Sequence, residues 1–204
     1  MELTVHTFLT LDGVMQSPGA ADEDSSGGFT RGGWVVPYFD GDFWTIVTGW
    51  FGRAAAILLG RNTYTAMHGF WSTVTDPDNV VAVKLNGLPK YVTSTTLRDP
   101  EWHGTTVLPD DVVERVRRLK QQPGGELQIH GSWALARTLH RAGLIDEYRL
   151  VVFPVTVGGG KRLFGDETAP ASGYTLVDSA TTSTGVVYSA LRPAPFEVGR
   201  VDER

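Results

Sequence analysis

Three short segments of the chain combine glycine, hydroxyl and cationic side chains in a way that suits phosphate binding. Gly60-Arg61-Asn62-Thr63 follows an apolar run and begins an expected helix, and Gly131-Ser132 stands in the same position after another apolar run. Thr93-Ser94-Thr95-Thr96 supplies hydroxyl groups after a third expected strand. Glycine allows close backbone approach to a ligand, and the free N–H groups at a helix start attract anions. Each segment alone is best explained as a structural turn, cap or polar strand end, but together the three favour a nucleotide carrying several phosphates.

Other familiar chemistries lack their residues. Gly158-Gly159-Gly160-Lys161 resembles a phosphate loop, but that motif requires glycine at position 155 and serine or threonine at position 162, where Val155 and Arg162 stand. No dinucleotide fingerprint lies between a strand and a helix, and no nucleophile elbow is present. The five histidines show no metal-ligand spacing and the chain has no cysteine, so we expect no metal site.

The composition predicts one ordinary folded domain. The chain has 204 residues, with 41% hydrophobic and 20% charged residues. Its 18 Lys and Arg against 23 Asp and Glu give a net charge of −5, which argues against a nucleic-acid partner. The N-terminal residues do not form a secretory signal, and no apolar run reaches the length of about 18 residues that a membrane span needs. We therefore expect a cytoplasmic protein with a domain at 1–193 and a polar tail at 194–204.

Hydrophobic periodicity predicts strands and helices that alternate until the C-terminal part, which has strands only. Phe43, Ile46, Val47, Trp50 and Phe51 form the clearest helical stripe. We expect Asp110 to begin a later helix, Ser132 to cap the next one, and Gly143 to follow its end. The expected strands are 3–9, 55–59, 90–93, 105–108, 127–129, 148–157, 174–179 and 185–191, and the expected helices are 43–54, 62–71, 78–85, 110–119 and 132–142. This order predicts an α/β fold with a mainly parallel sheet and antiparallel strands at one side.

Four motifs in this order resemble those of the dihydrofolate reductase superfamily. They are Asp12-Gly13-Val14-Met15, Gly60-Arg61-Asn62-Thr63-Tyr64, Leu88-Pro89-Lys90-Tyr91-Val92-Thr93-Ser94 and Gly159-Gly160-Lys161-Arg162-Leu163-Phe164. Within that superfamily the chain resembles the reductase domain of bifunctional riboflavin-biosynthesis deaminase-reductases and its stand-alone relatives, from about Leu3 to Pro193. The resemblance implies a three-layer fold, with helices on both faces of the sheet.

The resemblance also implies NADPH as cofactor. Gly60 and Arg61 match the family's Gly-Arg pair, with Arg61 expected near the adenosine 2′-phosphate and Thr63 at the pyrophosphate. Gly131 and Ser132 match a glycine pair at the helix that receives the pyrophosphate, and here the second glycine is replaced by serine.

Further matched positions surround the two ends of the cofactor. Ser94 and Thr95 match a hydroxyl pair at the 2′-phosphate, and a guanidinium flanked by hydroxyls suits a dianionic phosphate. Gly13, Val14 and Met15 match the loop that covers the nicotinamide, and Gly159 is expected on the nicotinamide side.

Catalysis in this family is hydride transfer to a C=N or C=O carbon, with a proton source supplied by the protein. Asp42 is the candidate for the carboxylate that holds the substrate. A competing interpretation is that Asp40 and Asp42 only cap the helix that follows them. The long loop from Ser17 to Pro37 and the residues after it supply Trp34, Tyr38 and Phe39, which we expect either to stack on a flat heterocyclic substrate or to pack in the core.

Two functions therefore stay open. The first is an NADPH-dependent reductase of a small heterocyclic substrate, of the pterin or pyrimidine type. The second is a protein on the same fold that binds NADPH or another ligand without catalysis. Relatives are commonly dimers, so we expect a homodimer, with the C-terminal strands as pairing surfaces.

Overall fold

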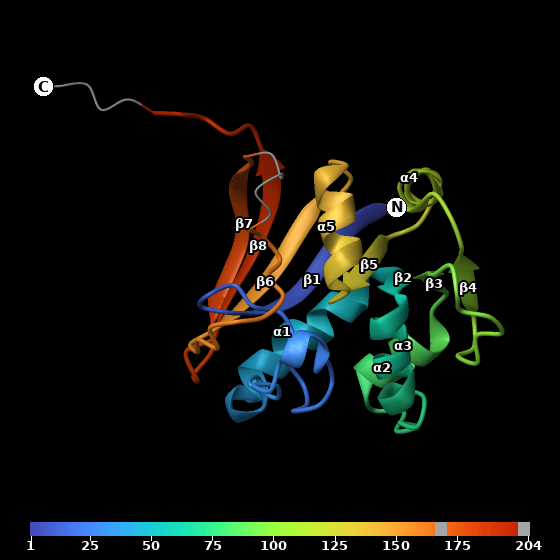
Figure 1. Ribbon diagram of the computed structural model, residues 1–204, viewed down its shortest axis with the longest axis horizontal. Coiled ribbons are helices and arrows are strands. Elements are labelled where there is room, and N and C mark those ends of the chain that lie inside the picture. Colours follow the sequence, from blue (N-terminus) through green and yellow to red (C-terminus); the bar gives the residue numbers. More distant parts are fainter. Residues whose placement is uncertain (166–170, 200–204) are drawn as a thin grey trace, which may run out of the picture.

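The computed structural model describes residues 1–165 and 171–199. Its centre is an eight-stranded sheet in the order β4-β3-β2-β5-β1-β6-β8-β7 (Figure 1). The strands are β1 Glu2–Thr10, β2 Ala54–Gly60, β3 Lys90–Thr93, β4 Thr105–Leu108, β5 Glu126–His130, β6 Glu147–Phe153, β7 Gly173–Thr181 and β8 Val187–Ala194. The α-helices are α1 Gly41–Arg53, α2 Arg61–Trp71, α3 Val80–Gly87, α4 Val112–Lys120 and α5 Trp133–Arg141.

The sheet is parallel through most of its width and antiparallel at one side. The pairs β1–β5, β1–β6, β2–β3, β2–β5 and β3–β4 are all parallel. The pairs β6–β8 and β7–β8 are antiparallel. This confirms the predicted α/β class, and it brings the carboxyl ends of β2, β3 and β5 to one edge of the sheet.

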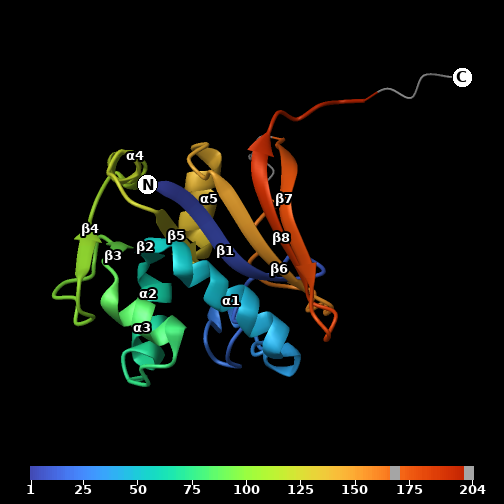
Figure 2. The same ribbon diagram turned by 180° about the vertical axis from the view of Figure 1, so that it is seen from behind.

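Helices cover both faces of the sheet, as Figures 1 and 2 show from opposite sides. One core contains buried side chains of α1, α2 and α3, together with Ile57, Val92 and Phe153 of the strands. The other contains buried side chains of α4 and α5, together with Leu3, Leu58 and Ile129. Because successive strand residues point to opposite faces, one apolar run such as β2 supplies both cores. The three-layer arrangement is as predicted.

Several element boundaries differ from the sequence prediction. The sixth strand ends at Phe153 rather than at 157, because Pro154 has no N–H group to continue the ladder. The fourth helix is capped by Asp111, whose side chain accepts from Glu114 N at 3.2 Å, and not by Asp110. The last strand begins at Val187 and runs to Ala194, so it includes the first residue of the expected tail. Residues 200–204 of that tail lie outside the described residues.

Among the described residues, no helix is both long and apolar enough to cross a membrane. The same part of the chain contains no group of three or more His, Asp or Glu side chains placed to hold a metal ion.

Candidate functional site

The glycine-containing junctions predicted from the sequence meet at one edge of the sheet. Gly60 is the last residue of β2, and it pairs with Thr93 at the end of β3. Gly131 follows β5, and its N–H donates to His6 O of β1 at 3.1 Å. Gly60 N donates to Ser132 Oγ at 2.9 Å, which joins the ends of β2 and β5 directly. A Cβ built at Gly131 would lie 3.7 Å from Thr63 Cγ2, so α2 and α5 begin side by side.

These two helices differ from the other three in how they begin. The helices α1, α3 and α4 each have a side-chain cap, from Asp40, Asn79 and Asp111. Gly60 and Ser132, which precede α2 and α5, make no side-chain cap hydrogen bond. Two helix N-termini without side-chain caps therefore face the same edge, where the helix dipoles favour an anion.

A hydrogen bond to a neighbouring strand occupies the Ser132 hydroxyl, which does not cap α5 as predicted. The Ser132 backbone is left-handed, with φ 58° and ψ 61°. Its hydroxyl instead accepts the hydrogen bond from Gly60 N. The expected cap is thus wrong, and the side chain joins two strand ends.

The predicted 2′-phosphate residues lie next to this edge. Arg61 is the first residue of α2 and is exposed, and within the described part of the chain it contacts no carboxylate. Ser94 follows β3, and its hydroxyl accepts from Leu97 N at 2.9 Å in a tight turn. Thr95, in the same turn, is exposed. An exposed guanidinium without a carboxylate partner keeps its charge available to a ligand.

The expected nicotinamide loop is fixed against the loop that follows β6. Val14 is fully buried, forms an isolated β-bridge with Arg162, and donates its N–H to Thr10 Oγ1 at 2.9 Å. Met15, also buried, donates its N–H to Lys161 O at 2.8 Å. A Cβ at Gly160 would lie 2.6 Å from Val14 Cγ1, so only glycine allows this approach. Gly13 has φ 77°, in the region that favours glycine, and Gly159 lies in the facing loop.

Asp12 ties the same two loops together. Its carboxylate accepts from Thr10 Oγ1 at 2.6 Å, Gly158 N at 2.7 Å and Val157 N at 3.2 Å. Desolvation acts to raise the pKa of Asp12, but these hydrogen bonds outweigh it and lower the pKa below its ordinary value. A carboxylate held by three donors serves to fix the loops.

The structure separates the two acidic residues at the start of α1. Asp40 is the cap, since its Oδ1 accepts from Phe43 N at 2.7 Å, and this hydrogen bond lowers its pKa. Its Oδ2 accepts from Ser183 Oγ and Thr184 Oγ1 in the turn between β7 and β8. Asp42 is exposed and accepts from Ser183 N at 3.1 Å. Capping by Asp40 is confirmed, whereas catalysis by Asp42 stays a prediction.

The three aromatic residues of the expected substrate loop have different surroundings. Trp34 is buried, packs edge-to-face on Phe153 at 5.5 Å, and donates Nε1–H to Gln16 O at 2.9 Å. Tyr38 packs edge-to-face on the same Phe153 at 5.8 Å. Phe39 is 40% exposed and stacks on Phe43 at 4.9 Å. Packing in the core is therefore the role that the structure gives Trp34, and Phe39 is the most accessible of the three.

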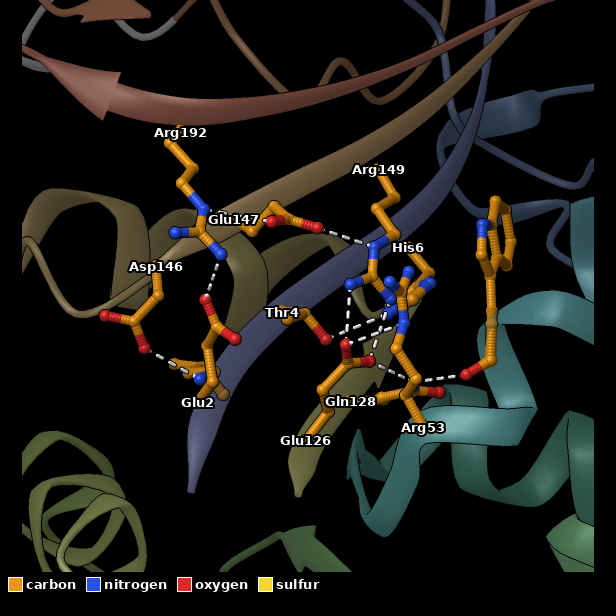
Figure 3. Close-up of polar contacts among 12 residues, drawn as sticks. Glu2, Thr4, His6, Arg53, Glu126, Gln128, Asp146, Glu147, Arg149 and Arg192 are labelled. Carbon is orange, nitrogen blue, oxygen red and sulfur yellow. Dashed lines mark hydrogen bonds and ion pairs between the residues drawn. The ribbon is translucent and has the colours of Figure 1, made fainter. Parts of the chain in front are cut away.

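The sequence interpretation missed a buried polar cluster on the α1 face of the sheet. His6 and His130 are paired across β1 and β5, and their rings stack at 4.9 Å. His130 Nε2 contacts Gln128 Oε1 at 3.1 Å, and Gln128 Nε2 donates to Glu126 Oε2 at 2.6 Å. Glu126 accepts two hydrogen bonds from the Arg149 guanidinium (Figure 3). A sequence pattern could have predicted this cluster. Polar residues occupy every second position of β1, β5 and β6, and this alternation places their side chains on one face of the sheet.

Burial keeps both histidines neutral. Desolvation is the largest cause that lowers the pKa of His130 to about 3, and the charge of Arg149 acts in the same direction. Desolvation also lowers the pKa of His6 well below its ordinary value, followed by the effects of His130 and Arg149. Neutral imidazoles can accept hydrogen bonds but supply no positive charge to a ligand.

Comparison with known proteins agrees with this geometry. The family model of the RibD C-terminal domain matches residues 2–188. The chain belongs to the RibD C-terminal domain family. Uncharacterized protein YyaP of Bacillus subtilis (strain 168) is 32% identical over 133 residues, which cover 64% of this chain and 70% of that protein.

Solved structures of low sequence identity share the fold. A protein of Shewanella sp. PV-4, described as a riboflavin biosynthesis protein, has a TM-score of 0.68 at 20% identity, covering 96% of this chain and 100% of that one. Dihydrofolate reductase of Enterococcus faecalis, solved with NADP(H), has a TM-score of 0.56 at 13% identity, covering 95% of this chain and 97% of that one. The family and the shared fold indicate a reductase-type function for this member of the RibD C-terminal domain family.

Proposed function

We propose that this protein is an NADPH-dependent reductase that reduces a C=N or C=O bond of a small heterocyclic substrate, of the pterin or pyrimidine type. The observation that carries the proposal is the meeting of two helix N-termini without side-chain caps, joined by the hydrogen bond from Gly60 N to Ser132 Oγ. A pyrophosphate suits this edge because it can accept from the N–H groups of both helices.

The chemical types of the residues along this edge of the sheet suit the successive groups of NADPH. Arg61 and the hydroxyls after β3 suit the 2′-phosphate, which NADH lacks. Glycine at position 131, with φ 61°, leaves room for close backbone approach. When bound, the cofactor supplies the hydride. The protein binds the phosphates, orients the nicotinamide ring with the loop at Gly13-Val14-Met15, and excludes water from the reacting atoms.

Replacement of Arg61 by alanine is expected to weaken NADPH binding about 10- to 100-fold, which corresponds to the loss of a charge-assisted interaction of about 1.5–3 kcal/mol. NADH affinity should change little, because NADH has no 2′-phosphate. Calorimetric titration of both cofactors measures the difference. Arg117→Ala, on α4, is the matched control and should leave both affinities unchanged. Equal loss for NADPH and NADH would contradict the assignment of Arg61 to the 2′-phosphate.

A non-catalytic NADPH-binding protein is the second candidate, since Asp42 is exposed and bonded to a turn. Oxidation of bound NADPH with a panel of cyclic imines and carbonyl compounds separates the two functions. A reductase should oxidise NADPH with at least one compound of the panel. If Asp42 takes part in catalysis, the variant Asp42→Asn should turn over that compound more slowly while its affinity for NADPH stays unchanged. Tight NADPH binding without oxidation by any member favours the non-catalytic protein.

We also propose that two copies of the chain associate as a homodimer. The strand β7 is at the edge of the sheet, and Leu176 and Val177 on it are 57% and 52% exposed. An exposed apolar edge strand is suited to pairing with another chain. Light scattering should give twice the chain mass of 22.2 kDa, and Val177→Lys should lower it. A monomer mass for the unchanged protein would contradict the proposal.

A further inference from the structure

Two ring nitrogen atoms in the buried polar cluster of the α1 face have no hydrogen-bond partner. Among the residues that the structure describes, His6 Nδ1 and Trp50 Nε1 are the two buried side-chain polar atoms without one. His6 is 2% exposed and Trp50 is 3% exposed, and their ring centroids lie 4.8 Å apart. Buried polar groups in folded proteins are nearly always paired, so two unpaired ones on adjacent rings require an explanation.

Hydrogen bonds along β5 set the tautomer of the neighbouring His130. Gln128 uses both of its side-chain N–H groups as donors, to Trp50 O at 2.8 Å and to Glu126 Oε2 at 2.6 Å. Gln128 Oε1 lies 3.1 Å from His130 Nε2, and an oxygen can only accept there. His130 Nε2 therefore carries the proton of this neutral ring, and His130 Nδ1 carries none.

Thr4 sets the opposite tautomer for His6. Thr4 is fully buried, and its hydroxyl contacts His6 Nε2 at 2.9 Å (Figure 3). Within the part of the chain that the structure describes, this is the one hydrogen bond of the Thr4 hydroxyl. The hydroxyl donates to Nε2, because its proton would otherwise be buried without an acceptor. The proton of the neutral His6 ring is then on Nδ1, so both unpaired atoms, His6 Nδ1 and Trp50 Nε1, are donors.

Positive charge near these two donors favours an acceptor atom. Desolvation is the largest cause that lowers the pKa of His6, and His130, Arg149 and Arg53 follow it. The two arginines thus produce a positive potential at the His6 ring. A carbonyl oxygen is partly negative and has two lone pairs, so it suits two N–H groups in such a potential.

The two donors lie directly behind the edge of the sheet proposed for NADPH. His6 O accepts from Gly131 N at 3.1 Å, and Gly131 belongs to that edge. Phe8 follows His6 on the same face of β1, toward the carboxyl end of the strand. The Phe8 ring is partly buried and stacks on Trp50 with centroids 6.0 Å apart. The surroundings of the donors toward this end are therefore aromatic, which suits a flat ring.

We propose that His6 Nδ1–H and Trp50 Nε1–H donate to a carbonyl oxygen on the ring of the substrate, and so select a heterocycle that carries a ring carbonyl. Both donors are buried in the free protein, so the Phe8 ring turns aside as the ligand enters. The two side chains bind and orient the ligand and transfer no proton. The inference rests on the proposed reductase function for the identity of the ligand as the substrate, whereas binding itself is measured without turnover.

Long-range ¹H–¹⁵N NMR spectra of the histidine rings test the assignment of the donors. At pH 7 we expect a proton on Nδ1 in His6 and on Nε2 in His130, because Thr4 and Gln128 impose opposite tautomers. The variants His6→Gln and His130→Gln identify the two sets of signals. A proton on Nε2 of His6 would remove one of the two donors and overturn the proposal.

Pyrimidin-4-one and pyrimidine are matched probes, since they share the ring and only the first carries a carbonyl. Pyrimidin-4-one should shift the indole N–H signal of Trp50 in a saturable way, whereas pyrimidine at the same concentration should not. Equal shifts by both probes, or no shift by either, would overturn the proposal. A magnetisation transfer from water to the Trp50 indole without any shift by pyrimidin-4-one would show that a buried water occupies the site instead.

Trp50→Phe and Trp44→Phe are matched variants on α1. Trp50→Phe keeps an aromatic ring but lacks the N–H group, while Trp44 is 40% exposed and packs on Phe39 and Phe43. Followed through the His6 signals, binding of pyrimidin-4-one should weaken about three- to tenfold in Trp50→Phe, the usual effect of one lost hydrogen bond. It should stay unchanged in Trp44→Phe. Equal affinity of Trp50→Phe and the unchanged protein would contradict the proposal. If Trp50→Phe does not fold, the two probes on the unchanged protein decide.

Titration with NADPH separates this inference from the reductase function. Trp50→Phe should leave the affinity for NADPH within about twofold, because Trp50 lies outside the cofactor edge. Oxidation of NADPH with the compound panel, but no carbonyl-dependent shift of Trp50, would overturn the inference and leave the reductase function intact. Binding of pyrimidin-4-one at Trp50 without any binding of NADPH would overturn the reductase function and leave the carbonyl site intact.

Discussion

Replacement of Arg149 by methionine is expected to lower the free energy of unfolding by about 3–5 kcal/mol, the usual cost of breaking a buried ion pair from one side. Arg149 is 1% exposed and has carboxylates on two sides. Its guanidinium donates to both oxygens of Glu126, at 2.8 Å and 2.6 Å, and to Glu147 Oε1 at 2.7 Å (Figure 3). Without the arginine, two carboxylates would remain buried with too little positive charge.

Urea denaturation at pH 7 measures this loss, and Arg192→Met is the matched control. Arg192 contacts the same Glu147, at 3.1 Å, but its side chain is 53% exposed. Because water screens an exposed pair, we expect the control to lose much less stability than Arg149→Met. The double replacement Arg149→Met with Glu126→Gln should recover part of the stability, since one of the unpaired charges is removed. A loss below about 1 kcal/mol for Arg149→Met would show that water reaches the cluster.

The second large effect is a loss of stability in weak acid. Both buried histidines have a lowered pKa in the folded protein, and that of His130 is about 3. An unfolded chain binds a proton at each histidine below about pH 6.5, so it binds more protons than the folded chain. The stabilisation is therefore complete above about pH 6.5 and is lost progressively as the pH falls toward 3. Between pH 7 and pH 5, His130 alone should account for about 2 kcal/mol, and His6 adds to the loss.

Free energies of unfolding measured from pH 7 to pH 5 test this expectation. The pKa of Glu126 is also lowered in the folded protein, and its protonation likewise reduces stability as the pH falls. That loss begins only near the ordinary carboxyl pKa of about 4.5, so the change in stability between pH 7 and pH 5 comes from the histidines. His140, whose pKa burial also lowers, contributes to the same slope. The variant His130→Gln should flatten the slope, and His103→Gln, at an exposed position, should not. Equal stability at pH 7 and pH 5 would contradict neutral burial of the pair.

Much of the fold could be predicted because its signals are local. The apolar stripe from Phe43 to Phe51 gives the helix α1, and Gly143 gives the left-handed residue after α5, with φ 62°. Alternation of strands and helices predicts the parallel sheet, since a parallel pair needs a crossover between its strands. The predicted element boundaries were wrong where a single residue ends an element, as Pro154 does after β6.

Contacts between distant segments could not be predicted in the same way. Ser132 looks like a cap in the sequence, but β2 and β5 pair side by side and bring Gly60 N to its hydroxyl across 72 positions. Asp40 and Asp42 look alike in the sequence at the start of α1. Only the structure shows that Asp40 caps the helix through Phe43 N, while Asp42 is exposed and accepts from Ser183 N. The stacking of His6 on His130 follows from the β1–β5 register.

The sequence by itself therefore determined the α/β class, the family resemblance and the junctions after three strands, at Gly60, Ser94 and Gly131, because turns, periodicity and motifs are properties of neighbouring residues. Only the tertiary structure decided which side chains meet. It joined the starts of α2 and α5, buried Arg149 between two carboxylates, and brought the rings of His6 and Trp50 into contact. The physical reason is that side-chain partners depend on strand order and register, which place residues far apart in the chain within hydrogen-bond distance.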